Sequence, residues 1–426
     1  MSEGARKLSA RAVTFVASLG LLSACAAKAP QWEFDTQPAF TVAGPRGAFV
    51  ADPSLAWTPG GRLYVGVSQT NGESAGYNLY STTADGDHLV KTGSAPVGPS
   101  MITGGQSGPV FIIDRDEHKH LLWADEVSGT HHLTAMQRGW DAPEWFIADV
   151  RDKNISPKKS IAFGGISTGP HDDVYVSFLD ERNNKVKDED VSQVWFARAA
   201  GGEPFARNVR IAGHTCACCR TATAAAPDGK TVYVAFRGNY ETDVRDMAVA
   251  TSHDGGRTFG KPVRLGPDGW KLHGCPESGP SLLAQGKRLY VVWFTLGTEL
   301  KPTIRLAVSD DLGRTFSPAK VISGNIFDAN HPRIAALTSD TAVVTFQGKD
   351  PSYLDGFGKT QAWVETVEGL NAGAPSAATP RGISIHDPVI AAANAQLVFV
   401  GAVAGDHVII TRGRLLGMTG LRARSE

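Results

Sequence analysis

Four cysteines in two short segments are the residues best suited to chemistry in this chain. Three lie in HTCACCR at 214–220, and the fourth lies in HGCPE at 273–277. In an exported chain they predict two disulfides, most directly Cys216–Cys219 with Cys218–Cys275, and Cys219–Cys275 is the alternative bond between the segments. Either arrangement places one bond inside a four-residue stretch, where disulfide geometry is demanding.

The same segments predict a metal site as the alternative to disulfides. Histidines stand at or just before the starts of four predicted repeats, and thiolate sulfur with imidazole nitrogen suits copper or zinc. The sequence has no pair of Cys-x-x-Cys zinc knuckles and no Cys-x-x-Cys-His haem motif. The candidate ligands are His214, Cys216, Cys218, Cys219, His273, Cys275, His331 and His386.

An eight-residue motif reveals a repeat that runs through most of the chain. SHDGGRTF at 252–259 returns 57 residues later as SDDLGRTF at 309–316. In each copy an aspartate is expected to bond neighbouring backbone amides, with Asp254 and Asp310 holding the two turns, while glycine allows the bend and phenylalanine packs inward. The structural motif residues are Ser252, Asp254, Gly256, Thr258, Phe259, Ser309, Asp311, Gly313, Thr315 and Phe316.

Strand starts recur at this spacing along the chain. We place them at Asp52, Gly108, Gly164, Arg220, Gly279, His331 and Asp387. Apolar runs rich in β-branched and aromatic residues predict second strands at 63–67, 174–178, 232–236, 289–293, 342–346 and 397–400, and third strands follow at 77–81, 193–198, 247–252, 304–309 and 361–365. This pattern predicts an all-β chain forming a β-propeller of four-stranded blades. Seven blades are favoured over six, and 32–42 supplies a strand that closes the ring.

The N-terminal segment predicts export and a lipid anchor. Basic residues precede an apolar run at 12–22 that is too short to span a bilayer, and LSAC at 22–25 resembles a bacterial lipobox ending at Cys25. Ala26 rather than Asp after this cysteine favours the outer membrane, on its periplasmic or surface face. The predicted organisation is a lipoprotein signal peptide at 1–25, a tether at 26–31, a propeller at 32–413 and a C-terminal tail at 414–426.

Charge and composition narrow the range of partners. The net charge is −1, and no block of Lys or Arg offers the basic surface that phosphate neutralisation needs. We therefore expect no nucleic-acid partner. The 47 glycines and 24 prolines suit a chain of many turns and no long helices.

The repeated motif resembles the Asp box, or BNR repeat, of the sialidase superfamily. Sialidases hold the substrate carboxylate with three arginines, use a tyrosine and a glutamate as nucleophile and activator, and use an aspartate as acid/base. The Arg-Ile-Pro segment that opens their first blade has no counterpart here, because Asp52 and Pro53 stand in its place. The residues that the resemblance nominates for catalysis are Arg220, Arg237, Arg245, Glu277, Arg333, Tyr240 and Tyr353.

Blade connectivity predicts where a functional site lies. The strand starts and the loops between second and third strands emerge on one face, called the mouth, and the eight-residue motifs emerge on the other. The mouth should collect Asp52, the cysteine and histidine residues, Glu277, His331 and Asp387.

We expect a sialidase-like propeller lipoprotein of the cell envelope that binds a ligand, such as a glycan or an envelope protein, or a metal at its mouth. The alternatives are a retaining exo-α-sialidase acting on terminal sialic acids and an envelope assembly or scaffold factor.

Overall fold

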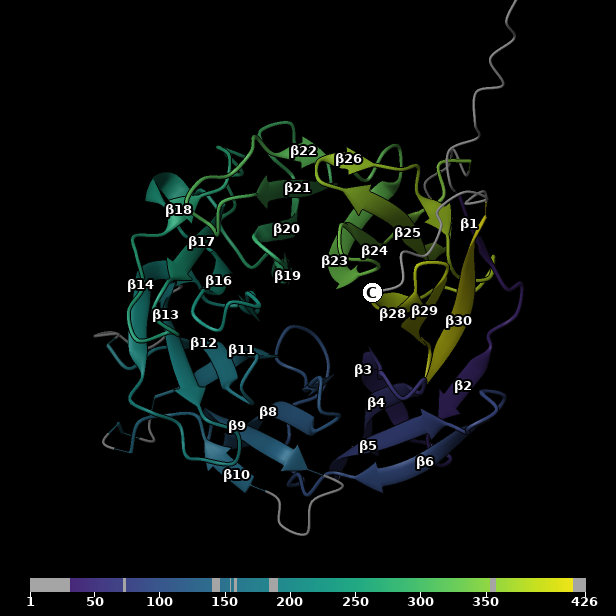
Figure 1. Cartoon of the computed structure of the whole chain (residues 1–426), viewed down its shortest axis with the longest axis horizontal. Coiled ribbons are helices and arrows are strands. Elements are labelled where there is room, and N and C mark those ends of the chain that lie inside the picture. The colour runs from purple at the N-terminus through teal and green to yellow at the C-terminus, as the bar shows by residue number, and fades with distance from the viewer. Residues whose placement is uncertain are drawn as a thin grey trace, which may run out of the picture.

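The computed structural model is an all-β ring of seven blades around a central axis (Figure 1). It describes residues 31–71, 74–139, 146–153, 155–156, 159–183, 191–352 and 358–416. The helical content of this part is one 3-10 turn, Glu241–Asp243. Across the described residues, no helix has the length and apolar character needed to cross a membrane. The predicted fold class is confirmed, and the six-blade alternative is wrong.

Each blade is an antiparallel sheet whose strands follow one another outward from the axis. Blade 1 comprises β3 Phe49–Trp57, β4 Leu63–Thr70, β5 Ala75–Thr82 and β6 Leu89–Ser94. Blade 2 comprises β7 Val110–Ile113, β8 Lys119–Val127, β9 Thr130–Gly139 and β10 Phe146–Asp149. Blade 3 comprises β11 Ile161–Thr168, β12 Val174–Asp180, β13 Val191–Ala199 and β14 Val209–Cys216. Blade 4 comprises β15 Ala222–Ala225, β16 Val232–Arg237, β17 Met247–Ser252 and β18 Val263–Arg264. Blade 5 comprises β19 Ser281–Gln285, β20 Arg288–Thr295, β21 Thr303–Ser309 and β22 Lys320–Val321. Blade 6 comprises β23 Phe327–Ala336, β24 Thr341–Lys349, β25 Thr360–Glu368, β26 Asn371–Ala372 and β27 Ser376–Ala377.

Blade 7 joins the two ends of the described chain. Its inner strands are β28 His386–Asn394, β29 Leu397–Ala404 and β30 His407–Leu416, and β1 Gln31–Phe34 and β2 Phe40–Ala43 both pair antiparallel with β30. The indole Nε1 of Trp32 also donates to Thr366 Oγ1 of blade 6 at 3.0 Å. The N-terminal strands therefore close the ring as the sequence predicts, and β30 ends at Leu416, three residues beyond the predicted propeller boundary.

The core lies between neighbouring blades rather than inside any one sheet. Strand β12 is buried along its whole length, and so is β16. Side chains of these two strands pack together, with Tyr175 and Leu179 of blade 3 in the same buried cluster as Val232 and Val234 of blade 4. Because both faces of a blade are covered, the second strands are mostly apolar, which explains the apolar runs in the sequence.

Four of the seven innermost strands, β3, β11, β23 and β28, contain a β-bulge. Strand register is interrupted between Ala51 and Ser54, Ala162 and Gly165, Asn330 and Arg333, and His386 and Val389. Each bulge contains a non-glycine residue at positive φ, namely Asp52 at 49°, Phe163 at 55°, His331 at 51° and Asp387 at 52°. Such strained positions redirect side chains out of a regular ladder. The predicted strand starts in blades 1, 3, 6 and 7 are these bulges.

The two eight-residue motifs form hydrogen-bonded turns between third and fourth strands. Asp254 Oδ1 accepts from Thr258 N at 2.9 Å, and Asp254 Oδ2 accepts from Thr258 Oγ1 at 2.6 Å. In the second copy Asp311 makes the equivalent bonds to Thr315. The expectation that Asp310 holds this turn is wrong, because its carboxylate instead pairs with Arg288 Nε at 2.6 Å.

Replacing the turn carboxylates should reduce stability without touching the mouth. Asp254→Ala or Asp311→Ala should lower the free energy of unfolding by about 1 to 3 kcal/mol, because backbone and hydroxyl donors lose their acceptor. Asp310→Ala is the matched control and should cost less, because it removes one exposed ion pair. Urea unfolding of the three variants measures the difference. Equal losses for Asp310→Ala and Asp311→Ala would contradict the assignment.

Candidate functional site

A cavity of about 260 Å³ opens on the axis at the mouth, among the innermost strands of blades 1, 2, 6 and 7 and the start of blade 4. Its charged lining consists of Asp52, Arg220, Arg333 and Asp387. The bulges in β3 and β28 bring Asp52 and Asp387 to this position. We call this cavity the axial site. It unites two of the predicted arginines with both aspartates placed at the mouth by the sequence.

Asp52 is the group in the axial site whose protonation changes near neutral pH. Burial raises the pKa of its carboxyl to about 6, and the negative charge of Asp387 acts in the same direction. Hydrogen bonds from Ser68 Oγ at 2.5 Å and from the Gly104 amide at 2.9 Å, together with Arg220, limit this rise. Asp52 therefore exchanges a proton close to pH 6.

Arg220 is held by a loop that reaches across the axis from blade 2. Its Nε donates to the carbonyl of Gln106 at 2.8 Å and its Nη2 donates to the carbonyl of Gly108 at 2.6 Å. Gln106 Oε1 also accepts from the amides of Arg220 at 3.3 Å and Gly279 at 2.9 Å. Burial, with the nearby charge of Arg333, lowers the pKa of Arg220 to about 10. Gln106 thus holds both Arg220, at the start of blade 4, and Gly279, at the start of blade 5, in position.

The far side of the axial site is a network of Arg333, Asp387 and two histidines. Asp387 accepts from His386 Nδ1 at 2.9 Å and lies 3.8 Å from His331 Nε2. Burial alone would raise the pKa of Asp387, but His386, His331 and Arg333 together hold it below its ordinary value. The hydrogen bond to Asp387 raises the pKa of His386, whereas burial lowers the pKa of His331. This side consequently retains an ionised carboxylate.

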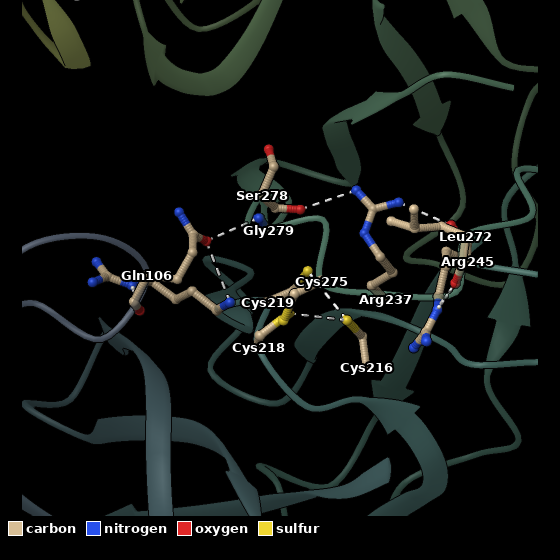
Figure 2. Close-up of a disulfide and its surroundings, with 11 residues drawn as sticks. Gln106, Cys216, Cys218, Cys219, Arg237, Arg245, Leu272, Cys275, Ser278 and Gly279 are labelled. Atoms are coloured by element: carbon tan, nitrogen blue, oxygen red, sulfur yellow. Dashed lines mark hydrogen bonds between the residues drawn. A yellow bond between two sulfur atoms is a disulfide. The ribbon is translucent and has the colours of Figure 1, made fainter. Parts of the chain in front are cut away.

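The four cysteines lie together, as Figure 2 shows: Cys216 ends β14, Cys218 and Cys219 precede β15, and Cys275 precedes β19. Cys218 and Cys275 form a disulfide with their Cα atoms 6.1 Å apart. Cys216 and Cys219 are buried free thiols whose Sγ atoms lie 3.4 Å apart, and Cys216 Sγ is 3.6 Å from Cys218 Sγ. One of the two predicted disulfides is therefore present, the second pair is adjacent but unbonded, and the alternative Cys219–Cys275 bond is not formed.

The two free thiols have opposite electrostatic environments. The hydrogen bond with Cys219, opposed by burial, lowers the pKa of Cys216 to about 6, with help from the Cys218 amide, Arg237 and Arg245. Burial and the proximity of Cys216 raise the pKa of Cys219 well above its ordinary value. The surroundings of the pair therefore favour ionisation of Cys216 over ionisation of Cys219.

The eight predicted metal ligands do not come together in one site: four are the clustered cysteines, two are histidines of the axial site and two are exposed histidines. The Sγ atoms of Cys216, Cys218 and Cys219 lie within 4.8 Å of one another, but Cys218 is committed to the disulfide. His331 and His386 instead contact Asp387 in the axial site. The remaining histidines lie on exposed parts of the mouth: His273 Nδ1 is 3.1 Å from Asp243, and the carbonyl of His214 accepts from the Asn239 amide. A sulfur site for copper or zinc would first require reduction of Cys218–Cys275.

The other residues nominated by the sialidase resemblance do not line the axial site. Arg237 is fully buried and donates to the carbonyls of Arg245, Ser278 and Phe294. Arg245 donates to the carbonyl of Leu272. The ring of Tyr240 packs under the guanidinium of Arg264, 4.4 Å away, and Glu277 is exposed. Tyr353 lies outside the described residues. The structure therefore separates the predicted arginines into Arg220 and Arg333, which line the cavity, and Arg237 and Arg245, which bond backbone carbonyls.

Sequence reasoning missed Gln106 and Ser68, although both stabilise charged residues of the axial site. The segment TGGQSGP at 103–109 offered a signal, since two successive glycines directly precede Gln106. Gly104 and Gly105 adopt φ of 82° and 61°, which allows the loop to turn in toward the axis. A polar side chain following such a turn was a candidate for contacting the centre of the ring.

Solved structures share the propeller architecture at low sequence identity. A polysaccharide lyase of family PL25, an ulvan lyase, matches with a TM-score of 0.52 and 12% identity, covering 89% of this chain and 95% of its own. The polysaccharide lyase Uly1 matches with a TM-score of 0.50 and 11% identity over 89% and 99%. A NanB sialidase mutant from Streptococcus pneumoniae matches with a TM-score of 0.43 and 12% identity over 90% and 69%. No protein family description and no curated protein matches the chain. The likeness shows the fold.

Removing the disulfide should destabilise the propeller. Cys275→Ser removes the disulfide between Cys218 and Cys275, which are 57 residues apart in sequence. A cross-link that closes a loop of this size raises the free energy of unfolding by about 2 to 4 kcal/mol. The variant should unfold at lower urea concentration than the wild type, and dithiothreitol should lower wild-type stability similarly. If dithiothreitol lowers the stability of the wild type but not that of the variant, the result would support the disulfide. Unchanged stability in both measurements would contradict it.

Proposed function

We propose that this protein is a lipid-anchored propeller of the bacterial cell envelope that binds a small carboxylate-bearing ligand, such as an acidic sugar, in the axial site. The observation that carries the proposal is the pairing of Arg220 and Arg333 in one cavity. Burial, and after it the nearby positive charge of Arg333, depresses the pKa of Arg220, so the two guanidinium groups lie close enough for charge repulsion. An anionic ligand would relieve this repulsion and gain charge-assisted hydrogen bonds.

Unused donor capacity supports the same ligand chemistry. The described hydrogen bonds occupy two nitrogens of Arg220 and one of Arg333, the latter donating to the carbonyl of Pro332 at 3.0 Å. A guanidinium carries five N–H donors arranged to match a carboxylate. Arg220 is fixed in place by Gln106, so its orientation is established before the ligand arrives. Arg333 then supplies most of the free donor capacity.

The dimensions and walls of the axial site favour one sugar-sized group. About 260 Å³ is near the lower end of small-molecule pockets. Apolar side chains of Leu55, Val110 and Ile334 complete the lining around the charged residues. A sugar acid presents both an anionic group for the arginines and C–H surfaces for such walls. We place this site in the periplasm or at the cell surface, tethered through Cys25 to the outer membrane.

Replacing Arg333 should weaken binding of acidic sugars selectively. Isothermal titration calorimetry with N-acetylneuraminate and glucuronate should show a loss of about ten-fold or more in affinity for Arg333→Gln, since charged hydrogen bonds contribute about 1.5 to 3 kcal/mol. Arg381→Gln is the matched control, because the side chain of Arg381 is 74% exposed. Glucose should bind weakly to every variant. Binding that is equal for glucose and glucuronate would contradict the proposal.

The same preparations separate the alternatives. Release of sialic acid from a fluorogenic sialoside would favour an exo-α-sialidase, in which Asp52 has the raised pKa expected of an acid/base group. A stoichiometric envelope protein that co-purifies would favour a scaffold factor. Acidic-sugar binding without turnover or a protein partner would favour the binding function proposed here.

Acidification should strengthen carboxylate binding. As pH falls from 8 to 5, Asp52 takes up a proton through its pKa of about 6, so negative charge leaves the axial site while both arginines stay charged. His331 and His386 gain positive charge in the same direction, so all three changes favour an anion. Affinity should rise by up to about ten-fold per pH unit for each proton taken up. In Asp52→Asn the pH dependence should be shallower, with tighter binding at pH 8; an unchanged slope would exclude Asp52 as a contributor.

Lipid attachment should depend on Cys25. Its position at the end of an apolar export signal predicts acylation, so Cys25→Ala should abolish incorporation of a palmitate analogue in bacterial cells and leave unprocessed or soluble protein. Cys275→Ser is the control that removes a different cysteine and should keep full labelling. Equal labelling of wild type and Cys25→Ala would refute the anchor.

A further inference from the structure

Cys216 occupies the centre of the cysteine cluster, within reach of both neighbouring sulfurs. Its Sγ atom lies 3.6 Å from Cys218 in the disulfide and 3.4 Å from the free thiol of Cys219. These separations are close to those at which reacting atoms are positioned for attack. Cys216 can therefore attack Cys218 in the disulfide, and Cys219 can then attack Cys216 to resolve the new disulfide.

Differences in burial among the four cysteines favour one direction of thiol–disulfide exchange. Cys216 and Cys219 are 2% and 1% exposed, and Cys218 is 8% exposed, whereas Cys275 lies on an exposed segment between β18 and β19. Thiol–disulfide exchange proceeds by attack of a thiolate on one sulfur and departure of the other. Attack on Cys218 from Cys216 would therefore leave the reactive product at the surface.

We propose that the four cysteines form an internal thiol–disulfide exchange unit, which moves the disulfide from Cys218–Cys275 to Cys216–Cys219 and presents Cys275 as an exposed thiol for exchange with external disulfides. In the first step the Cys216 thiolate attacks Cys218 Sγ. The bond between Cys216 and Cys218 forms, the bond between Cys218 and Cys275 breaks, and Cys275 leaves as a thiolate.

The second step completes the transfer without an outside oxidant. Cys219 gives its proton to the departed Cys275 thiolate and attacks Cys216 Sγ. The Cys216–Cys219 bond forms and Cys218 leaves as a thiolate. One disulfide, one thiolate and one thiol are present before and after the two steps, so electrons and protons balance.

The segment that carries Cys275 is anchored independently of the disulfide. At its start the Leu272 amide donates to the carbonyl of Asp243, and Leu272 in turn accepts from Arg245. At its end Arg237 donates to the carbonyl of Ser278 at 2.9 Å, and Gln106 accepts from the Gly279 amide. Cys275 would thus stay near Cys218 after the bond breaks, which makes the exchange reversible.

Trapping the exposed thiol tests the proposal on the full-length wild-type protein, with no reductant and no sugar ligand. Native protein is incubated with iodoacetamide over hours, denatured, and mapped by peptide mass spectrometry. We expect alkylated Cys275 to accumulate together with an equal amount of Cys216–Cys219 disulfide, while Cys218–Cys275 declines. Retention of Cys218–Cys275, with alkylation confined to Cys216 or Cys219 or absent, would overturn the proposal.

Two single variants identify the attacking and resolving thiols. Cys216→Ser should keep Cys218–Cys275 and reduce Cys275 alkylation at least ten-fold, because the nucleophile is missing. Cys219→Ser should stop after the first step, giving a Cys216–Cys218 disulfide with alkylated Cys275. If either variant fails to fold, the wild-type mapping still decides. Purified protein with four free thiols and one bound copper or zinc would also overturn the proposal, and none of these results depends on binding in the axial site.

Discussion

Antiparallel pairing of β1 and β2 with β30 is the constraint on which the rest of this structure depends. A propeller blade has no stable core of its own, because the apolar surfaces of its middle strands face the two neighbouring blades. In an open ring, blade 7 would expose both a row of unpaired backbone groups and the apolar side of β30. Trp32, 5% exposed in a cluster with Leu415 and Ile409, shows that the closing strands also complete the packing. Closure therefore fixes the positions of all inner strands around one axis.

Four of the inner strands, β3, β11, β23 and β28, are interrupted by bulges. The bulges contain Asp52, Phe163, His331 and Asp387, each at positive φ. Non-glycine residues in that conformation cost energy, and surrounding structure must compensate. Here the compensation is visible at Asp52, which accepts hydrogen bonds from Ser68 and Gly104. It is also visible at Asp387, whose carboxylate accepts from His386 and whose backbone amide donates to Gln347 Oε1. The bulges in β3 and β28 thus bring the two carboxylates of the axial site to the cavity.

Sequence periodicity predicted the elements that depend on local pattern. The six apolar runs coincide with β4, β12, β16, β20, β24 and β29, and the proximity of Cys275 to the other cysteines followed from equivalent positions in the repeats. The division of the arginines could not be predicted, because Arg220 and Arg237 differ in which blade their guanidinium reaches rather than in local sequence. The cross-axis role of Gln106 was hidden for the same reason, since it contacts residues 114 and 173 positions away. Adjacent aspartates such as Asp310 and Asp311 are distinguished only by turn geometry.

Gly279 shows how closely the cysteine cluster and the axial site are joined. A Cβ atom at this position would lie 2.1 Å from the carbonyl oxygen of Arg220, so the entry to blade 5 approaches the arginine more closely than any side chain would allow. The Gly279 amide and the Arg220 amide share one acceptor, Gln106 Oε1. Cys219 precedes Arg220 and Cys275 lies four residues before Gly279, so both segments that carry sulfur also carry this contact. The segment that carries Cys275 thus ends at a contact with Gln106, the residue that orients Arg220, so the cysteine cluster and the axial site share one anchor.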